Sequence, residues 1–190
     1  ESFVLNVLNE KKNGYYVEIG AGWPVKNSNT YLLETKYGWN GVSFENGKKR
    51  VKKYNQKRKN KTLLQDAITF DYLKYFYDNN FPKQIDYLQM DIHPAEDTLL
   101  ALKNIPLDRY RFSVITYEHN GYQNKQNQIE SQRILKQYGY KLVVEGLMLN
   151  DGVWYEDWWV DPLAVDYESY KEFIAEYITH HELFNGANIK

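Results

Sequence analysis

Short runs of β-branched and aromatic residues alternate along this chain with longer stretches in which apolar residues recur every three or four positions. Runs of the first kind are typical of strands, and stretches of the second kind are typical of helices. Strands are therefore predicted at residues 15–19, 41–45, 62–69, 85–92, 111–118, 140–148 and 154–160. Helices are predicted at residues 28–36, 47–59, 71–78, 95–104, 126–138 and 168–181.

The order of these elements predicts an α/β fold of three layers. Strands and helices alternate at the spacing of right-handed crossover units, so the seven-stranded sheet should be mostly parallel and covered by helices on both faces. The last two strands follow each other through Asn150-Asp151-Gly152 without a helix, which predicts an antiparallel hairpin at one edge. No internal repeat or linker divides the sequence, so residues 1–190 are expected to form a single domain.

Composition narrows the function classes. The chain has no cysteine, which excludes disulfides, thiolate nucleophiles and cysteine-ligated zinc, fits a reducing compartment and favours a cytoplasmic location. The net charge of −1 gives no bias toward polyanions, and no apolar run approaches the roughly 20 residues of a membrane span. Because the sequence starts at Glu1 without a methionine or a signal pattern, we expect a piece excised from a longer chain or a processed product.

A glycine-containing turn follows the first strand. Gly20-Ala21-Gly22 lets the backbone turn tightly at the edge where ligands bind in open α/β sheets. By itself this pattern fits a dinucleotide, a flavin or no ligand at all, but Val25 stands where the dinucleotide pattern has its third glycine. Glu45 ends the second strand and Asp66-Ala67 lies in the third, where ribose hydroxyls and an adenine edge would lie. Together these positions indicate an adenosine-containing ligand.

Several ordered motifs resemble the FkbM-type methyltransferases over about residues 14–162. They include Val17-Glu18-Ile19-Gly20-Ala21-Gly22, Ser28-Asn29-Thr30-Tyr31, Phe44-Glu45, Asp91-Ile92 and Val114-Ile115-Thr116-Tyr117-Glu118-His119. The resemblance implies the Rossmann-like class I methyltransferase fold, S-adenosylmethionine as methyl donor, and O-methylation of a sugar, glycan or other small molecule, with a deoxyhexose such as rhamnose as one acceptor. It also implies that cofactor is bound by Glu18, Gly20, Ala21, Gly22, Asn29, Thr30, Glu45, Asp66, Ala67 and Asp91. Where the family usually has Asp-Ile-Glu-Gly, this chain has Asp91-Ile92-His93-Pro94, which puts the usual role of that glutamate in doubt.

The ends of the fourth and fifth strands carry the candidate catalytic residues. A sugar hydroxyl must lose its proton to attack a sulfonium methyl group, so the site needs a general base, a Lewis-acid metal or both. Asp91, His93 and His119 are the catalytic candidates, and Asp91 with Glu118 suits Mg²⁺ or Mn²⁺. The alternative is structural: Asp91 caps the next helix and His119 packs against it. His180 and His181 are expected on a solvated helix face.

An aromatic segment near the end of the chain is the candidate acceptor site. Trp154 and Tyr155 offer aromatic planes for a sugar ring, and Glu156 and Asp157 offer acceptors for its hydroxyls. Alternating aromatic residues on an edge strand are equally typical of a core. The polar residues 120–124 are a candidate lid. We expect a sugar or glycan acceptor, no membrane partner, and a glycosyltransferase as a fused or separate partner.

Two other functions remain open. Residues 48–61 contain nine lysines and arginines, a stripe that could track the phosphates of a nucleic acid, although the near-neutral net charge and the absence of an Asp/Asn-Pro-Pro-Tyr/Phe tetrad favour a solvated helix face. The His93-Pro94 departure keeps open a module that binds the cofactor without catalysis.

Overall fold

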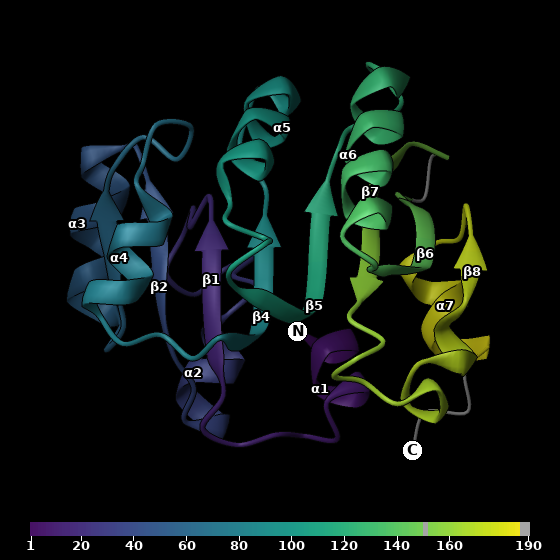
Figure 1. The fold of residues 1–190 in the computed structure, drawn as a ribbon, viewed down its shortest axis with the longest axis horizontal. Coiled ribbons are helices and arrows are strands. Elements are labelled where there is room, and N and C mark those ends of the chain that lie inside the picture. Colours follow the sequence, from purple (N-terminus) through teal and green to yellow (C-terminus); the bar gives the residue numbers. More distant parts are fainter. Residues whose placement is uncertain (150–151, 187–190) are drawn as a thin grey trace.

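A computed structural model describes residues 1–149 and 152–186, and within them the strands form one sheet (Figure 1). The sheet has eight strands in the order β3-β2-β1-β4-β5-β7-β6-β8. Their bounds are β1 Tyr15–Ile19, β2 Asn40–Glu45, β3 Lys61–Leu64, β4 Gln84–Met90, β5 Arg111–Glu118, β6 Lys141–Met148, β7 Trp154–Val160 and β8 Ala175–Glu176. The helices are α1 Ser2–Val7, α2 Tyr31–Tyr37, α3 Lys48–Lys57, α4 Tyr72–Asp78, α5 Ala95–Asn104, α6 Lys125–Gln137 and α7 His180–Gly186, with short 3₁₀ turns at Tyr167–Ser169 and Lys171–Phe173.

The pairing of the strands confirms the predicted α/β fold. Strands β1 to β5 pair in parallel, and β7 is antiparallel to both β5 and β6. The strand order reverses between β1 and β4, so the carboxyl ends of these two strands border the crevice where α/β sheets bind ligands. The two-residue strand β8 adds to β6 in parallel and makes an eighth strand beyond the predicted hairpin. Asn150 and Asp151 of the predicted turn lie outside the described residues.

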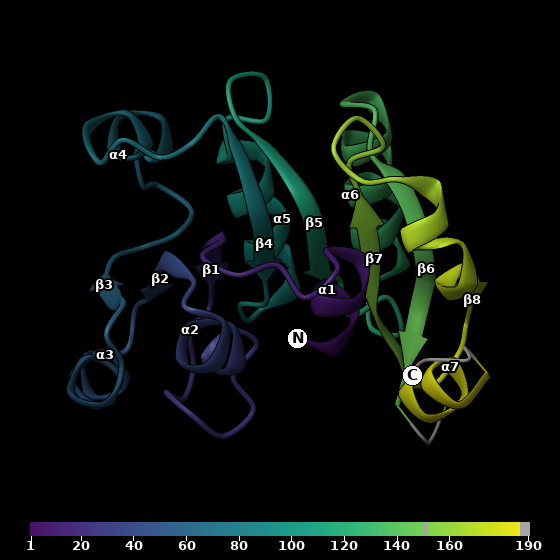
Figure 2. The ribbon, with the colours of Figure 1, turned by 90° about the horizontal axis from the view of Figure 1, so that it is seen from below.

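Two apolar clusters cover the faces of the sheet. Alternation along β7 sends Trp158 into one cluster and Trp159 into the other, as a two-residue period requires. The Trp159 cluster packs under α4, α5 and α6, whereas the Trp158 cluster packs under α1, α2 and α7. Figure 2 shows α1, α2 and α7 on the same side of the sheet. None of the helices in the described part of the chain has the length and hydropathy of a membrane span.

The segment after β7 differs most from its prediction. The helix predicted at residues 168–181 is wrong, because two 3₁₀ turns, β8 and the start of α7 occupy this range. Tyr170 and Phe173 are buried while Ile174 is 47% exposed, and Tyr177 has a φ of 49°, which interrupts any helix. Pairing with β6 therefore replaces helical bonds at this point.

Helix α1, the start of α2 and the end of β3 also differ from the prediction. The short helix α1 was not predicted, and α2 begins at Tyr31 instead of residue 28. Strand β3 ends at Leu64, so the strand predicted at residues 62–69 is wrong beyond that point. Residues 65–68 leave the sheet and line a cavity beside β2 instead.

Gly20 joins the ends of β1 and β4. Its φ is 92°, and a Cβ built on it would lie 1.8 Å from the carbonyl oxygen of Asp91. The backbone N–H groups of Gly20 and Ala21 both donate to the carbonyl of Phe44 at the end of β2, and Asp91 donates its N–H to Ile19. The backbones of three strands therefore meet where only glycine fits.

We predict that Gly20→Ala lowers the free energy of unfolding by more than about 3 kcal/mol, because the backbone of Asp91 must move to admit a methyl group. Gly22→Ala is the matched control: Gly22 also has a positive φ, of 56°, but its Cβ would meet no atom within 4 Å. The free energy of unfolding of this control should fall by only about 1 kcal/mol. Equal losses in urea denaturation of the two variants would contradict the proposed close approach.

Candidate functional site

Two cavities open at the carboxyl ends of the central strands, and Asp91 lines both. The first cavity, of about 380 Å³, lies beyond β1, β2 and β3, and the second, of about 410 Å³, lies beside β4, β5 and β7. Of the predicted cofactor residues, the first cavity is lined by Gly20, Gly22, Glu45, Asp66, Ala67 and Asp91. Asn29 and Asp91 line the second cavity. The shared position of Asp91 makes it the wall between the two cavities.

Glu45 is held at the end of β2 by the glycine turns around it. Its carboxylate accepts the backbone N–H of Gly22 at 3.2 Å and that of Gly47 at 2.8 Å, and Arg50 approaches it at 3.5 Å. Asp66 accepts the backbone N–H of Ile68 at 2.9 Å and remains exposed. The first cavity thus presents fixed hydrogen-bond acceptors toward whatever ligand occupies it. Asn46, Arg50 and Gln65 also line it and were not predicted as site residues.

Glu18 and Thr30 are buried in a network of hydrogen bonds. Glu18 is 1% exposed and accepts the hydroxyl groups of Thr30 at 3.0 Å, Ser43 at 2.6 Å and Tyr54 at 3.0 Å. Burial raises the pKa of Glu18 to about 7. Neither Glu18 nor Thr30 lines a cavity described above, and buried Ala21 does not either, so cofactor binding by these residues stays a prediction.

Arg58 is a buried member of this polar cluster that the sequence did not single out. It pairs with Glu34 at 2.9 Å and donates to the carbonyl oxygens of Pro24 and Thr30 and to the hydroxyl of Ser28. These bonds tie the loop after the glycine turn to the residue that follows α3. In the sequence Arg58 is one of nine basic residues within residues 48–61, and nothing local distinguishes it from its exposed neighbours.

The second cavity combines aromatic rings with carboxylates. Its lining includes Tyr87, Thr116, Glu118, Tyr155, Glu156, Trp158 and His180. The hydroxyl groups of Tyr87 and Thr116 are 2.8 Å apart, and the indole N–H of Trp158 donates to Glu156. The sequence analysis missed three of these site residues, Tyr87, Thr116 and Trp158. Their alternation within strands is typical of core positions.

His180 and His181 are both exposed, as predicted. The ring of His180 nevertheless lies 5.5 Å from that of Trp158, and its Nε2 is 3.1 Å from the hydroxyl of Tyr155. Partial burial of the imidazole lowers the pKa of His180 below the ordinary value. The helix itself differs from the prediction, because α7 begins at His180 whereas the predicted helix ended at residue 181.

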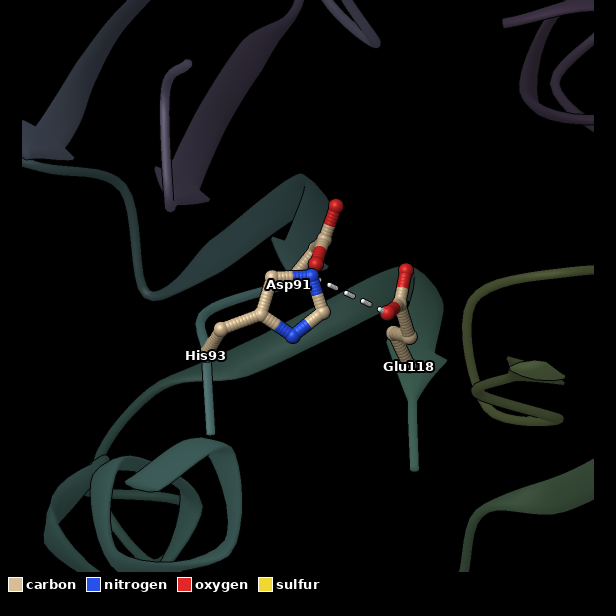
Figure 3. Close-up of side chains that lie close together, drawn as sticks. All are labelled: Asp91, His93 and Glu118. Carbon is tan, nitrogen blue, oxygen red and sulfur yellow. Dashed lines mark ion pairs between the residues drawn. The ribbon is translucent and has the colours of Figure 1, made fainter. Parts of the chain in front are cut away.

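Asp91, His93 and Glu118 come together where β4 and β5 end (Figure 3). One potential ligand atom from each residue lies within 4.8 Å of the others, and Nε2 of His93 is 3.8 Å from Oε1 of Glu118. Burial raises the pKa of Asp91, and burial together with the nearby Asp91 carboxylate raises the pKa of Glu118 to about 8. Two carboxylates held this close repel each other when both are ionised, and a cation between them would relieve the repulsion.

His119 and Asp157 are buried, so their predicted roles in catalysis and acceptor binding are corrected. Nε2 of His119 lies 3.1 Å from Asp157, and Nδ1 of His119 accepts the backbone N–H of Gly121. Asp157 also accepts bonds from Gln128, Gln132 and the backbone of Gly146. Both side chains have their partners inside the protein, and neither is exposed.

The rest of the predicted acceptor segment divides in two. Tyr155 and Glu156 line the second cavity. Trp154 does not, because its ring packs against Tyr177 at 6.1 Å. Residues 120–124, the predicted lid, line neither cavity, and their movement stays a prediction.

The buried Glu18 predicts a pH-dependent stability. Its folded-state pKa is raised, so the folded protein holds this proton more tightly than the unfolded chain does, and stability is lost as the pH rises from about 4.5 toward 7. Between about pH 5 and pH 8, the free energy of unfolding of the wild type should fall by roughly 2 kcal/mol more than that of Glu18→Gln. The glutamine keeps the shape of the side chain but does not titrate. Urea denaturation at both pH values measures this difference, and parallel losses in the two proteins would contradict it.

Comparison with known proteins identifies the family. The model of the methyltransferase FkbM domain matches residues 6–142. No protein of curated function matches the sequence significantly.

Solved structures share the fold at low sequence identity. An rRNA methylase from Streptococcus thermophilus is 15% identical, with 84% of this chain and 92% of that chain covered and a TM-score of 0.52. The N-methyltransferase NodS from Bradyrhizobium japonicum WM9, in complex with S-adenosyl-L-homocysteine, is 9% identical, with coverages of 85% and 84% and a TM-score of 0.55. Fibrillarin from Aeropyrum pernix, with S-adenosyl-L-methionine bound, is 10% identical, with coverages of 83% and 74% and a TM-score of 0.56. These likenesses establish the class I methyltransferase fold.

Proposed function

This chain belongs to the FkbM family of S-adenosylmethionine-dependent methyltransferases, and from that premise we propose that it methylates a hydroxyl oxygen of a sugar or glycan. The observation that carries the proposal is the pair of cavities that share Asp91. Methyl transfer from a sulfonium is an in-line displacement, so the acceptor oxygen must reach the methyl carbon directly from a site that adjoins the donor site. Two adjoining cavities with one residue in common fit that requirement.

The first cavity suits the methyl donor. Glu45, held by Gly22 and Gly47, offers carboxylate oxygens for ribose hydroxyls, and Asp66 with Ala67 offers a polar and a small side chain for the adenine. The donor carries a positive sulfonium, which carboxylates such as Asp91 attract. This assignment keeps the sequence-based roles of Glu45, Asp66, Ala67 and Asp91, with Gly20 and Gly22 as the backbone that approaches the ligand.

The second cavity suits a sugar ring. Tyr155 provides a flat apolar surface with a polar edge, and Thr116 and Glu156 provide hydrogen-bonding groups for hydroxyls. A volume of about 410 Å³ has room for a monosaccharide or the end of a glycan. A deoxyhexose such as rhamnose fits this mixture of apolar and polar groups, and a glycosyltransferase would supply or use such an acceptor.

We assign the proton transfer to His93. The acceptor oxygen bonds to the methyl carbon as the carbon–sulfur bond breaks. The electron pair of the broken carbon–sulfur bond stays on sulfur, and the hydroxyl proton passes to Nε2 of His93. Asp91 and Glu118 would hold Mg²⁺ or Mn²⁺, and when bound this cation supplies Lewis-acid activation of the hydroxyl. The convergence of two carboxylates and an imidazole supports both assignments.

Methyl transfer is tested by incubating the protein with S-adenosylmethionine and neutral sugars, including a rhamnoside, and measuring S-adenosylhomocysteine together with the methyl ether by mass spectrometry. We expect turnover that falls at least about tenfold in chelator and returns with Mn²⁺ or Mg²⁺. Full activity in chelator would remove the metal from the proposal. Donor binding in calorimetry without any methylated product would favour the non-catalytic module instead.

His93→Ala separates a base from a metal ligand. As the base, His93 contributes about 100-fold to turnover, and its loss leaves Mn²⁺ affinity unchanged. If it ligates the metal, the variant loses Mn²⁺ affinity in calorimetry as well. The matched control is His181→Ala, because His181 is exposed on α7 and lines neither cavity. A near wild-type rate for His93→Ala would exclude His93 from the chemistry.

A further inference from the structure

The second cavity is unusual in the charge of its walls. Three carboxylates line it beside the proposed reaction centre, those of Asp91, Glu118 and Glu156. None of the described residues that line it is a lysine or an arginine. A fourth carboxylate, that of Glu1, also lines the cavity but is engaged by the backbone N–H groups of Leu32 and Leu33 at the start of α2. The cavity is therefore acidic without a compensating cationic side chain.

Glu156 stands out among these carboxylates. It lies directly opposite Glu118 in the antiparallel pair of β5 and β7, an arrangement that repels when both side chains are ionised. Its hydrogen-bond donor is the neutral indole of Trp158. Burial is the largest effect and raises the pKa of Glu156 to about 7, although the α-amino group of Glu1 is a nearby positive charge that lowers this pKa in part. The carboxylate is therefore negatively charged above that pH even where a divalent cation neutralises Asp91 and Glu118.

We infer that Glu156 restricts the acceptor to sugars without negative charge, that is, to neutral or amine-bearing rings, and excludes phosphorylated and carboxylated ones. This inference rests on the proposed function, because it takes the second cavity as the acceptor site. The Coulomb energy between like charges at contact in a partly buried cavity is large enough to reject an anion. The same field attracts an ammonium group, and Tyr155 offers an aromatic ring that favours a cation as well.

The indole N–H of Trp158 provides the measurement, because it donates directly to Glu156 and should shift when the cavity fills. Protein saturated with S-adenosylhomocysteine is titrated, at constant ionic strength, with D-glucose, D-glucosamine and D-glucose 6-phosphate while this resonance is followed by NMR. We expect glucosamine to bind most tightly, and glucose 6-phosphate to bind at least about tenfold more weakly than glucose. Equal or tighter binding of the phosphorylated sugar would overturn the inference.

Two variants show whether Glu156 is responsible. Glu156→Gln keeps an acceptor for Trp158 and should reduce the discrimination between glucose and its phosphate to about threefold or less. Glu156→Asp retains the charge and should preserve the discrimination, which keeps the test valid if the glutamine variant is poorly folded. Glu172→Gln, an exposed carboxylate outside both cavities, is the matched control. Unchanged discrimination in Glu156→Gln would overturn the assignment to Glu156.

The proposed function fails in a different way. If none of the three sugars moves the Trp158 resonance and no neutral sugar is methylated, the acceptor class itself is wrong, and this inference falls with it. If neutral and phosphorylated sugars are methylated equally well, the sugar methyltransferase stands and only the charge selectivity is lost.

Discussion

The close approach of two backbones at Gly20 is the constraint on which the rest of this structure depends. The carbonyl of Asp91 occupies the place where any other residue would carry its Cβ, so the end of β4 can reach the end of β1. This contact lies where the strand order reverses, next to Asp91, which lines both cavities. The carboxylates and rings around those cavities take their positions from strands that this contact aligns.

The sequence predicted the central strands and the ligand edge of the sheet well, because both depend on local signals. A two-residue apolar period defines a strand, and Glu45 and Asp91 must lie at the same edge if their strands are parallel. Gly20 was recognisable because a turn directly after a buried strand commonly needs a positive φ.

The sequence could not predict which polar side chains would turn inward. Glu18 is in the same strand as Gly20, yet Ser43 and Tyr54 from other elements enclose it. His119 follows Glu118 directly, but its partner Asp157 comes from a strand that is distant in the sequence. Burial of this kind is set by tertiary contacts, and a single sequence does not contain them. The same reason explains residues 168–181, where pairing with β6 outweighs helical propensity.

The position of Asp91 has a thermodynamic consequence. Because Asp91 lines both cavities, a positive charge bound in one cavity weakens the attraction that its carboxylate exerts on a ligand in the other. Affinities of the two cavities are then linked, and by reciprocity each ligand alters the binding of the other by the same factor. Methyl transfer removes the positive charge of the sulfonium. The attraction of Asp91 for the two products therefore differs from its attraction for the two substrates. A single side chain can in this way make the release of products and the binding of new substrates depend on whether the methyl group has been transferred.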